Sequence, residues 1–216
     1  GAKTGELFYD STNRDFKYGF PNVTTAGAWS TGNSLGTARK DMGGVGIQTA
    51  ALAYGGSTPS STRDETESYN GTSWTELSDL NTAKAGVGSA GTYTSALKFG
   101  GSGAVTENES WDGSSWTELS DLNTGKNGPG GAGSSNTNAL AFGGSVPSGP
   151  EKTATVETWD GSSWTEVTDL NTARGNLIGV GKANTAALAV GGDPPGVLTE
   201  QWNGSSWTEL GDMNTA

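Results

Sequence analysis

The sequence predicts an all-β protein made of tandem repeats, and two observations lead to this fold class. The segment 69–80 returns nearly unchanged at 111–122, 159–170 and 202–213. The repeats have periods of 45, 42, 48 and 43 residues, a range typical of solenoids and propellers. Within each repeat the hydrophobic residues alternate in short runs, as in β-strands, and no run has helical spacing. The repeats begin at Leu35, Leu80, Leu122, Leu170 and Met213.

Each repeat is expected to contain four short strands. In the second repeat these are a Gly-rich strand at 86–91 and alternating strands at 94–99, 106–111 and 115–119. Asn-Gly or Asp-Gly separates the last two strands, and these dipeptides supply the positive φ angles of tight hairpins. The four hairpin turns are Asn70-Gly71, Asp112-Gly113, Asp160-Gly161 and Asn203-Gly204.

The composition agrees with a repeat architecture. Only 31% of the 216 residues are hydrophobic and 36 are Gly, which is too little apolar material for a large continuous core. Repeats need no such core, because each unit buries a modest face against its neighbour. We therefore divide a single domain into repeats at 35–79, 80–121, 122–169 and 170–212, with an N-terminal segment 1–34 and the start of a further repeat at 213–216.

Two further features recur in every repeat. A Gly pair closes the second strand, and an aromatic residue in the third strand is followed five residues later by a Trp in the fourth. The Gly pairs are Gly55-Gly56, Gly100-Gly101, Gly143-Gly144 and Gly191-Gly192, and the aromatic pairs are Tyr69 with Trp74, Trp111 with Trp116, Trp159 with Trp164, and Trp202 with Trp207. Adjacent strands would bring each aromatic pair together. Packing between repeats is the favoured role of the rings, with sugar stacking as the alternative.

These features resemble the kelch motif of β-propellers, and the resemblance covers residues 35–213. It implies four-stranded blades arranged around a central channel. We expect five blades, the fifth being three-stranded and formed by the hairpin at 7–16, Phe16-Lys17-Tyr18 and Ala28-Trp29-Ser30. The N-terminal strands would then lie beside the last repeat and close the ring. Because the chain begins with Gly and stops where a repeat begins, a fragment or a processed form is expected.

One acid and one base also recur at fixed positions. The acids are Glu67, Glu109, Glu157 and Glu200, two residues before the third-strand aromatic, and the bases are Arg39, Lys84, Lys126 and Arg174, four residues after each repeat start. Structural ion pairs within or between blades are the favoured interpretation. A ligand-binding ring and simple solvation are the alternatives.

The variation in repeat length falls almost entirely in the loop between the second and third strands. In a propeller these loops emerge on one face, and exposed variable loops commonly carry recognition. Tolerance of insertions is the competing explanation. If the protein recognises a ligand, the candidate residues on this face are Arg63, Asp64, Glu107, Glu151, Lys152 and Asp193.

Composition also limits the function classes. The net charge is -11 without a basic cluster, so neither nucleic acid nor membrane insertion is expected. His and Cys are absent, which removes the common nucleophiles, bases and zinc ligands. Galactose oxidase, a kelch-type enzyme, needs copper ligands and a Tyr-Cys pair that this chain lacks. We expect no enzyme activity, no cofactor and no metal site.

The N-terminal hairpin and the Asn-Thr-Ala-Arg and Ala-Ala-Leu-Ala segments resemble kelch-like virion proteins of tailed marine and cyanobacterial bacteriophages. This second resemblance implies a structural or adhesion module of a phage particle, in a tail fibre, tail or capsid decoration. Its expected partners are other virion proteins, host-surface glycans or further copies of itself. The alternative is a secreted bacterial lectin-like propeller with weak sugar sites on several blades.

Overall fold

The computed structural model describes residues 7–10, 15–18, 32–146, 151–193 and 196–214. The chain divides into two compact units, 1–32 and 33–216. In the first unit, β1 (Leu7–Asp10) pairs with β2 (Asp15–Tyr18) as an antiparallel hairpin in which Leu7 is opposite Tyr18. The remaining strands all belong to the second unit.

The second unit is a β-propeller of four antiparallel blades, each with four strands in chain order. Blade 1 contains β3 (Gly43–Ile47), β4 (Ala50–Tyr54), β5 (Thr66–Tyr69) and β6 (Trp74–Glu76). Blade 2 contains β7 (Gly88–Thr92), β8 (Ser95–Phe99), β9 (Asn108–Trp111) and β10 (Trp116–Glu118). Blade 3 contains β11 (Gly130–Ser135), β12 (Asn138–Phe142), β13 (Val156–Trp159) and β14 (Trp164–Val167). Blade 4 contains β15 (Ile178–Ala183), β16 (Ala186–Val190), β17 (Thr199–Trp202) and β18 (Trp207–Glu209). The predicted all-β fold with four-stranded blades is confirmed.

The prediction of a fifth blade is wrong. The propeller has four blades, and each takes all its strands from one repeat. No sheet is therefore left one strand short, so the N-terminal strands have no sheet to complete, and β1 and β2 pair with each other. The predicted strand at Ala28-Trp29-Ser30 lies outside the described residues. The N-terminal segment also lacks the Gly pair that closes the second strand of every blade.

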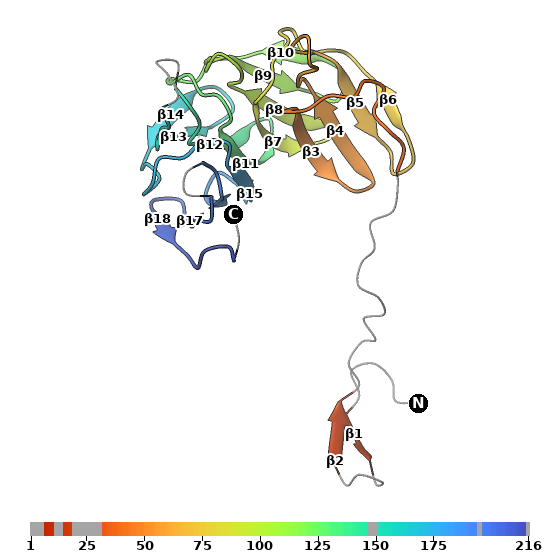
Figure 1. The fold of residues 1–216 in the computed structure, drawn as a ribbon, viewed down its shortest axis with the longest axis vertical. Helices are drawn as coiled ribbons and strands as arrows, with labels where there is room; N and C mark the ends of the chain where they lie inside the picture. The colour runs from red at the N-terminus through yellow and green to blue at the C-terminus, as the bar shows by residue number, and fades with distance from the viewer. Residues whose placement is uncertain (1–6, 11–14, 19–31, 147–150, 194–195, 215–216) are drawn as a thin grey trace. The chain divides into compact units, whose positions relative to one another are not determined.

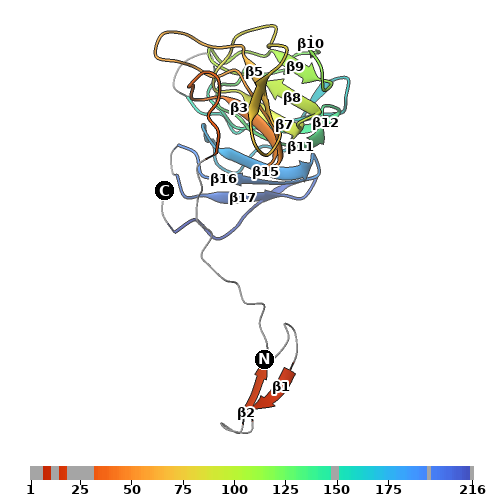
Figure 2. The ribbon, with the colours of Figure 1, turned by 90° about the vertical axis from the view of Figure 1, so that its right-hand side faces the viewer.

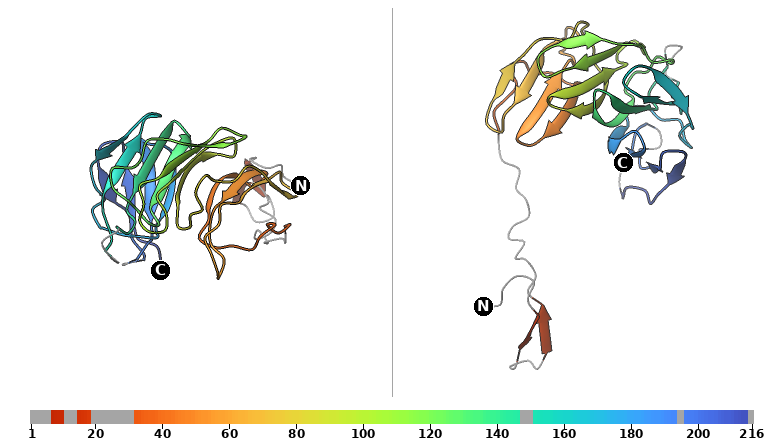
Figure 3. Two further views of the ribbon diagram at one scale, coloured as in Figure 1. Left: turned by 90° about the horizontal axis from the view of Figure 1, so that it is seen from above. Right: turned by 180° about the vertical axis from the view of Figure 1, so that it is seen from behind.

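The four blades follow one another in an arc, from blade 1 at one end to blade 4 at the other (Figures 1 and 3). Their first strands form the inner side, where β3 packs on β7, β7 on β11 and β11 on β15. Figure 2 shows β15, β16 and β17 lying side by side in blade 4. A pocket of about 210 Å³ on this inner side, which we call the channel, is lined by Gly44, Ser89, Gly131 and Gly179 from the four first strands.

We call the face of a blade that is turned to the next blade in the chain its forward face, and the opposite one its rear face. At each of the three junctions, the forward face supplies a Leu and an aromatic residue from the second strand, together with the first Leu of the next repeat. The rear face of the following blade supplies Ala and two Trp residues. Between blades 1 and 2 the junction contains Leu52, Tyr54 and Leu80 against Ala96, Trp111 and Trp116. The other two contain Leu97, Phe99 and Leu122 against Ala139, Trp159 and Trp164, and Leu140, Phe142 and Leu170 against Ala187, Trp202 and Trp207.

The Gly pair that closes each second strand has positive φ at both positions, for example 65° and 132° at Gly100 and Gly101. A Cβ on Gly100 would lie 2.5 Å from the carbonyl oxygen of Lys126, so a side chain is excluded by contact as well as by backbone conformation. The pair lets the loop leave the second strand close to the start of the next repeat. Gly101 N–H then donates to the Lys126 carbonyl at 2.8 Å.

Candidate functional site

The two members of each aromatic pair contact one another across the third and fourth strands of their blade. Ring centroids lie 5.0 Å apart in Tyr69–Trp74, 5.4 Å in Trp111–Trp116 and Trp159–Trp164, and 5.3 Å in Trp202–Trp207. The fourth-strand Trp also meets the second-strand aromatic of the previous blade edge to face. These centroid distances are 4.7 Å for Tyr54–Trp116 and 5.2 Å for both Phe99–Trp164 and Phe142–Trp207. Buried in this way, the Trp residues of blades 2 to 4 have no free ring face for a sugar.

The third-strand Trp residues additionally hold the turn between the first two strands of their own blade. Trp111 Nε1 donates to the carbonyl of Tyr93 at 3.1 Å, Trp159 Nε1 to that of Asn136 and Trp202 Nε1 to that of Asn184, both at 2.9 Å. Blade 1 has Tyr69 at this position and therefore lacks the indole donor. The turns of blades 2 to 4 are thus fixed from inside the blade.

The four recurring Glu residues are buried and each fastens the start of its own repeat. The four relative exposures are 4% for Glu67 and 1% for Glu109, Glu157 and Glu200. Their Oε2 atoms accept the backbone N–H of the second residue of the repeat, at 2.8, 2.8, 2.7 and 2.7 Å. These hydrogen bonds hold each buried carboxylate in place. The acids therefore belong to the scaffold of each blade.

The recurring bases approach these acids in three repeats. Arg39 Nη1 lies 2.8 Å from Glu67, Lys126 Nζ 3.9 Å from Glu157, and Arg174 Nη2 2.7 Å from Glu200. The second repeat departs from this pattern. Lys84 there pairs with Glu107 at 3.4 Å, and Lys98 on β8 reaches Glu109 at 3.4 Å.

The surroundings of Lys126 shift the pKa of its side chain. Burial lowers the pKa of its ammonium group to about 8, against the opposing attraction of Glu157. The same ammonium donates to the Thr155 carbonyl at 3.0 Å and to its hydroxyl group. These partners are all internal, and the lowered pKa of Lys126 reflects desolvation within the blade.

Three Asn residues complete the acid clusters and were missed by the sequence reasoning. Asn81, Asn123 and Asn171 donate through Nδ2 to the Glu Oε2 and also to the carbonyl of the fourth-strand Trp. Their signal was the Asn that follows the first Leu in three repeats, where the first repeat has Gly36. Its recurrence could have indicated a polar anchor.

The six candidate ligand residues lie in or beside the loops between second and third strands, but most are engaged within the protein. Arg63 pairs with Glu65, whose hydrogen bond raises the pKa of Arg63. Glu107 lies 3.4 Å from Lys84 and 3.7 Å from Lys98, and Lys152 lies 3.7 Å from Asp193. Asp64 and Glu151 are exposed. This face therefore offers a ligand few uncommitted charged groups.

The turns between first and second strands lie at the other end of the blades from these loops and form one mouth of the channel. It holds a cavity of about 410 Å³ lined by residues of all four blades, among them Ile47, Tyr93, Ser134 and Lys182. Tyr93 is 45% exposed and Ile47 is 68% exposed. Thr92 and Thr94 flank the tyrosine and also line the cavity. The sequence reasoning missed this site, because the turns looked like simple connections. The available signal was a Tyr in one turn where the other three turns have Gln or Asn.

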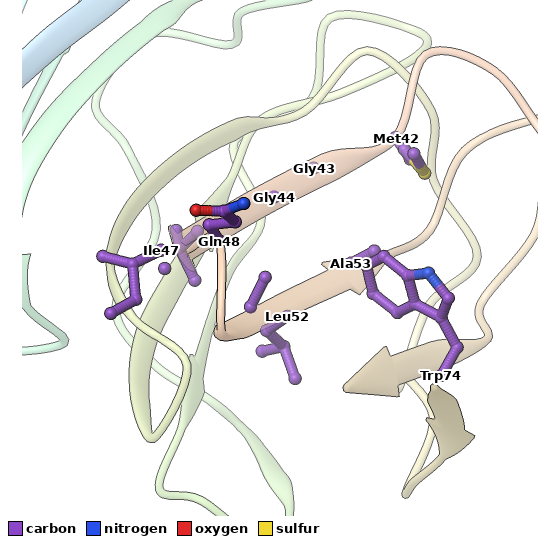
Figure 4. A pocket seen from close by; sticks show the side chains of 11 residues that line it. Met42, Gly43, Gly44, Ile47, Gln48, Leu52, Ala53 and Trp74 are labelled. Atoms are coloured by element: carbon purple, nitrogen blue, oxygen red, sulfur yellow. The ribbon is translucent and has the colours of Figure 1, made fainter. Parts of the chain in front are cut away.

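Blade 1 carries a second hollow, on its rear face. Its volume is about 510 Å³, and it is lined by Gly44, Gly46, Ala51, Ala53 and Trp74 with their neighbours. Figure 4 shows its lining, with Gly44 on β3 and Ala53 and Trp74 on the strands beyond. The lining is almost entirely apolar and contains no charged side chain. An exposed apolar surface of this kind commonly marks a protein interface.

Within the described residues, no three or more His, Cys, Asp or Glu side chains come together in a way that could hold a metal ion. Nor does that part of the chain contain a helix that is long and apolar enough to cross a membrane. No protein-family model matches the chain. No curated protein matches it either. The site must therefore be interpreted from its own geometry.

Proposed function

We propose that the propeller is a non-enzymatic structural and adhesion module of kelch-like type in a bacteriophage particle, and that it binds a host-surface glycan. The observation that carries the glycan proposal is the exposed Tyr93 ring at the mouth of the channel. An aromatic face packs against the C–H face of a sugar, and nearby hydroxyl and ammonium groups can bond to sugar hydroxyls. Thr92, Thr94, Ser134 and Lys182 supply such groups around the cavity.

The position of Tyr93 favours one sugar site for each propeller. The equivalent turn positions hold Gln48, Asn136 and Asn184, so only one of the four turns carries an aromatic ring. A lectin with weak sites on several blades would need comparable platforms in the other turns. The Trp residues of blades 2 to 4 do not provide them, because their rings are buried at the junctions.

A glycan array with the whole chain tests this proposal. We expect binding to at least one glycan and a loss of about fivefold or more in the Tyr93→Ala variant, because one aromatic contact is worth about 1 kcal/mol or more. Glu151→Ala is the control on the opposite face, and it should bind as the unchanged chain does. Loss of binding by Glu151→Ala alone would move the site to the loops between second and third strands. Binding to no sugar at high protein concentration would overturn the glycan proposal.

A further inference from the structure

The two ends of the arc carry opposite halves of the junction that joins consecutive blades. Blade 1 has no preceding blade, so its rear face, with Ala51, Ala53, Tyr69 and Trp74, receives no forward face within the described residues. Trp74 is accordingly half-buried, whereas each fourth-strand Trp of blades 2 to 4 is 6% exposed. The hollow beside Trp74 occupies the place where a neighbouring blade would pack.

Blade 4 presents the complementary forward face. Its apolar residues stand at positions that the next blade covers in blades 1 to 3. Four of the seven exposed large hydrophobic residues found in the described part of the chain lie here, which is a concentration that usually marks an interaction surface. The forward face of blade 4 comprises Ile178 (64% exposed), Val180 (52%), Leu210 (39%) and Met213 (37%), together with the half-buried Leu188 and Val190.

Backbone hydrogen bonds at the inner edge also run in one direction along the series of blades. Gly86 N–H donates to the Asp41 carbonyl at 2.7 Å, Gly128 N–H to the Gly86 carbonyl at 2.7 Å, and Asn176 N–H to the Gly128 carbonyl at 3.0 Å. This series joins each blade to the one before it. No backbone hydrogen bond in the described residues extends it beyond the Asp41 N–H in blade 1 or the Asn176 carbonyl in blade 4. One end thus offers a donor and the other an acceptor.

We propose that a second copy of this chain docks head to tail, with the forward face of blade 4 in one copy on the rear face of blade 1 in the other. The occupant is a second copy because the two faces reproduce the two sides of an internal junction and every copy carries both. Contacts between different patches on identical chains are heterologous and close into a ring when the rotation permits. Two copies joined at both ends would form one ring of blades, in which all four end faces are covered.

Sedimentation equilibrium of the whole chain tests this assembly, with a dimer as the expected mass. Val180→Glu places a charge on the forward face of blade 4, and Ala51→Glu places one on the rear face of blade 1. Each should weaken association about 100-fold and give a monomer, because a charge buried without a partner is strongly unfavourable. Thr165→Glu, on an exposed strand of internal blade 3, is the matched control and should remain a dimer.

Mixing the two monomeric variants distinguishes head-to-tail docking from a symmetric contact. The Val180→Glu chain keeps an intact blade 1 face and the Ala51→Glu chain an intact blade 4 face, so the mixture should form a heterodimer through one junction. Far-ultraviolet circular dichroism of each variant alone checks that both remain folded. A monomeric unchanged chain would overturn the proposal, as would folded variants that stay dimeric or a mixture that stays monomeric.

Discussion

Phe99 and Val190 occupy the same position at the end of the second strand, yet their surroundings differ. Phe99 is fully buried beneath Trp164, whereas Val190 is half-buried on the forward face of blade 4. Gly88 lies opposite Phe99, and a Cβ on it would come within 2.1 Å of the ring. Opposite Val190 the repeat has Ile178. The aromatic residue and the Gly opposite it are therefore replaced together. The replacement occurs in blade 4, whose forward face is not part of an internal junction.

The largest expected effect on the free energy of unfolding comes from truncating each of these two side chains in a separate variant. Phe99→Ala should lower the free energy of unfolding by about 3 to 5 kcal/mol, because it leaves a cavity under Trp164. Val190→Ala should lower it by about 1 kcal/mol, because its side chain is already partly in water. Urea unfolding in the Val180→Glu background, where the outer junction is open, measures both. Equal losses would mean that the end face is packed as tightly as an internal junction.

The second prediction concerns how stability depends on pH, and it compares Lys126 of blade 3 with Arg174 of blade 4. Burial lowers the pKa of Lys126 in the folded chain to about 8, below the ordinary value of a lysine in the unfolded chain. Between these values the unfolded chain binds more protons, so stability should rise with pH. From pH 8 to 10 the rise is expected to be about 2 kcal/mol. Above pH 10 it should reverse, because burial raises the pKa of Tyr54 and only the unfolded tyrosine ionises.

Urea unfolding at pH 8 and at pH 10 measures this rise. Lys126→Arg is the control, because blade 4 has Arg174 at the same position and arginine remains charged throughout this range. The rise should disappear in that variant. A rise of equal size in Lys126→Arg would assign the effect to other groups.

The sequence predicted the repeated parts of the fold well and its ends poorly. Asp112-Gly113 and the Gly100-Gly101 pair act through local backbone conformation, and their residue types alone predict that conformation. The number of blades depends instead on whether the N-terminal segment can complete a sheet, and every sheet is already complete. At the site level, Glu157 could be singled out by its recurrence, but the exposure of Tyr93 depends on how four turns meet around the channel.

The smallest expected effect concerns one hydrogen bond that differs between junctions. Trp116 Nε1 donates to the Thr66 hydroxyl at 2.9 Å, whereas Trp207 Nε1 is buried and has no partner in the described part of the chain. Val156 holds the position in blade 3 that Thr66 holds in blade 1. Thr66→Val should therefore cost about 1 to 2 kcal/mol, and Val156→Thr should gain up to about 1 kcal/mol, because an unmade buried hydrogen bond costs more than a made one contributes.

Urea unfolding of the two variants and of the double exchange measures this difference. Because the two sites lie at different junctions, the effects should add in the double variant. A loss of stability in Val156→Thr would show that its hydroxyl does not reach Trp207 Nε1. The junction between blades 2 and 3 has Asn108 at this position, and neither Trp164 Nε1 nor Asn108 Oδ1 has a hydrogen-bond partner among the described residues. Asn108→Thr should then gain less than Val156→Thr, because the amide already donates to the Ser120 carbonyl at 3.0 Å and that bond would be lost.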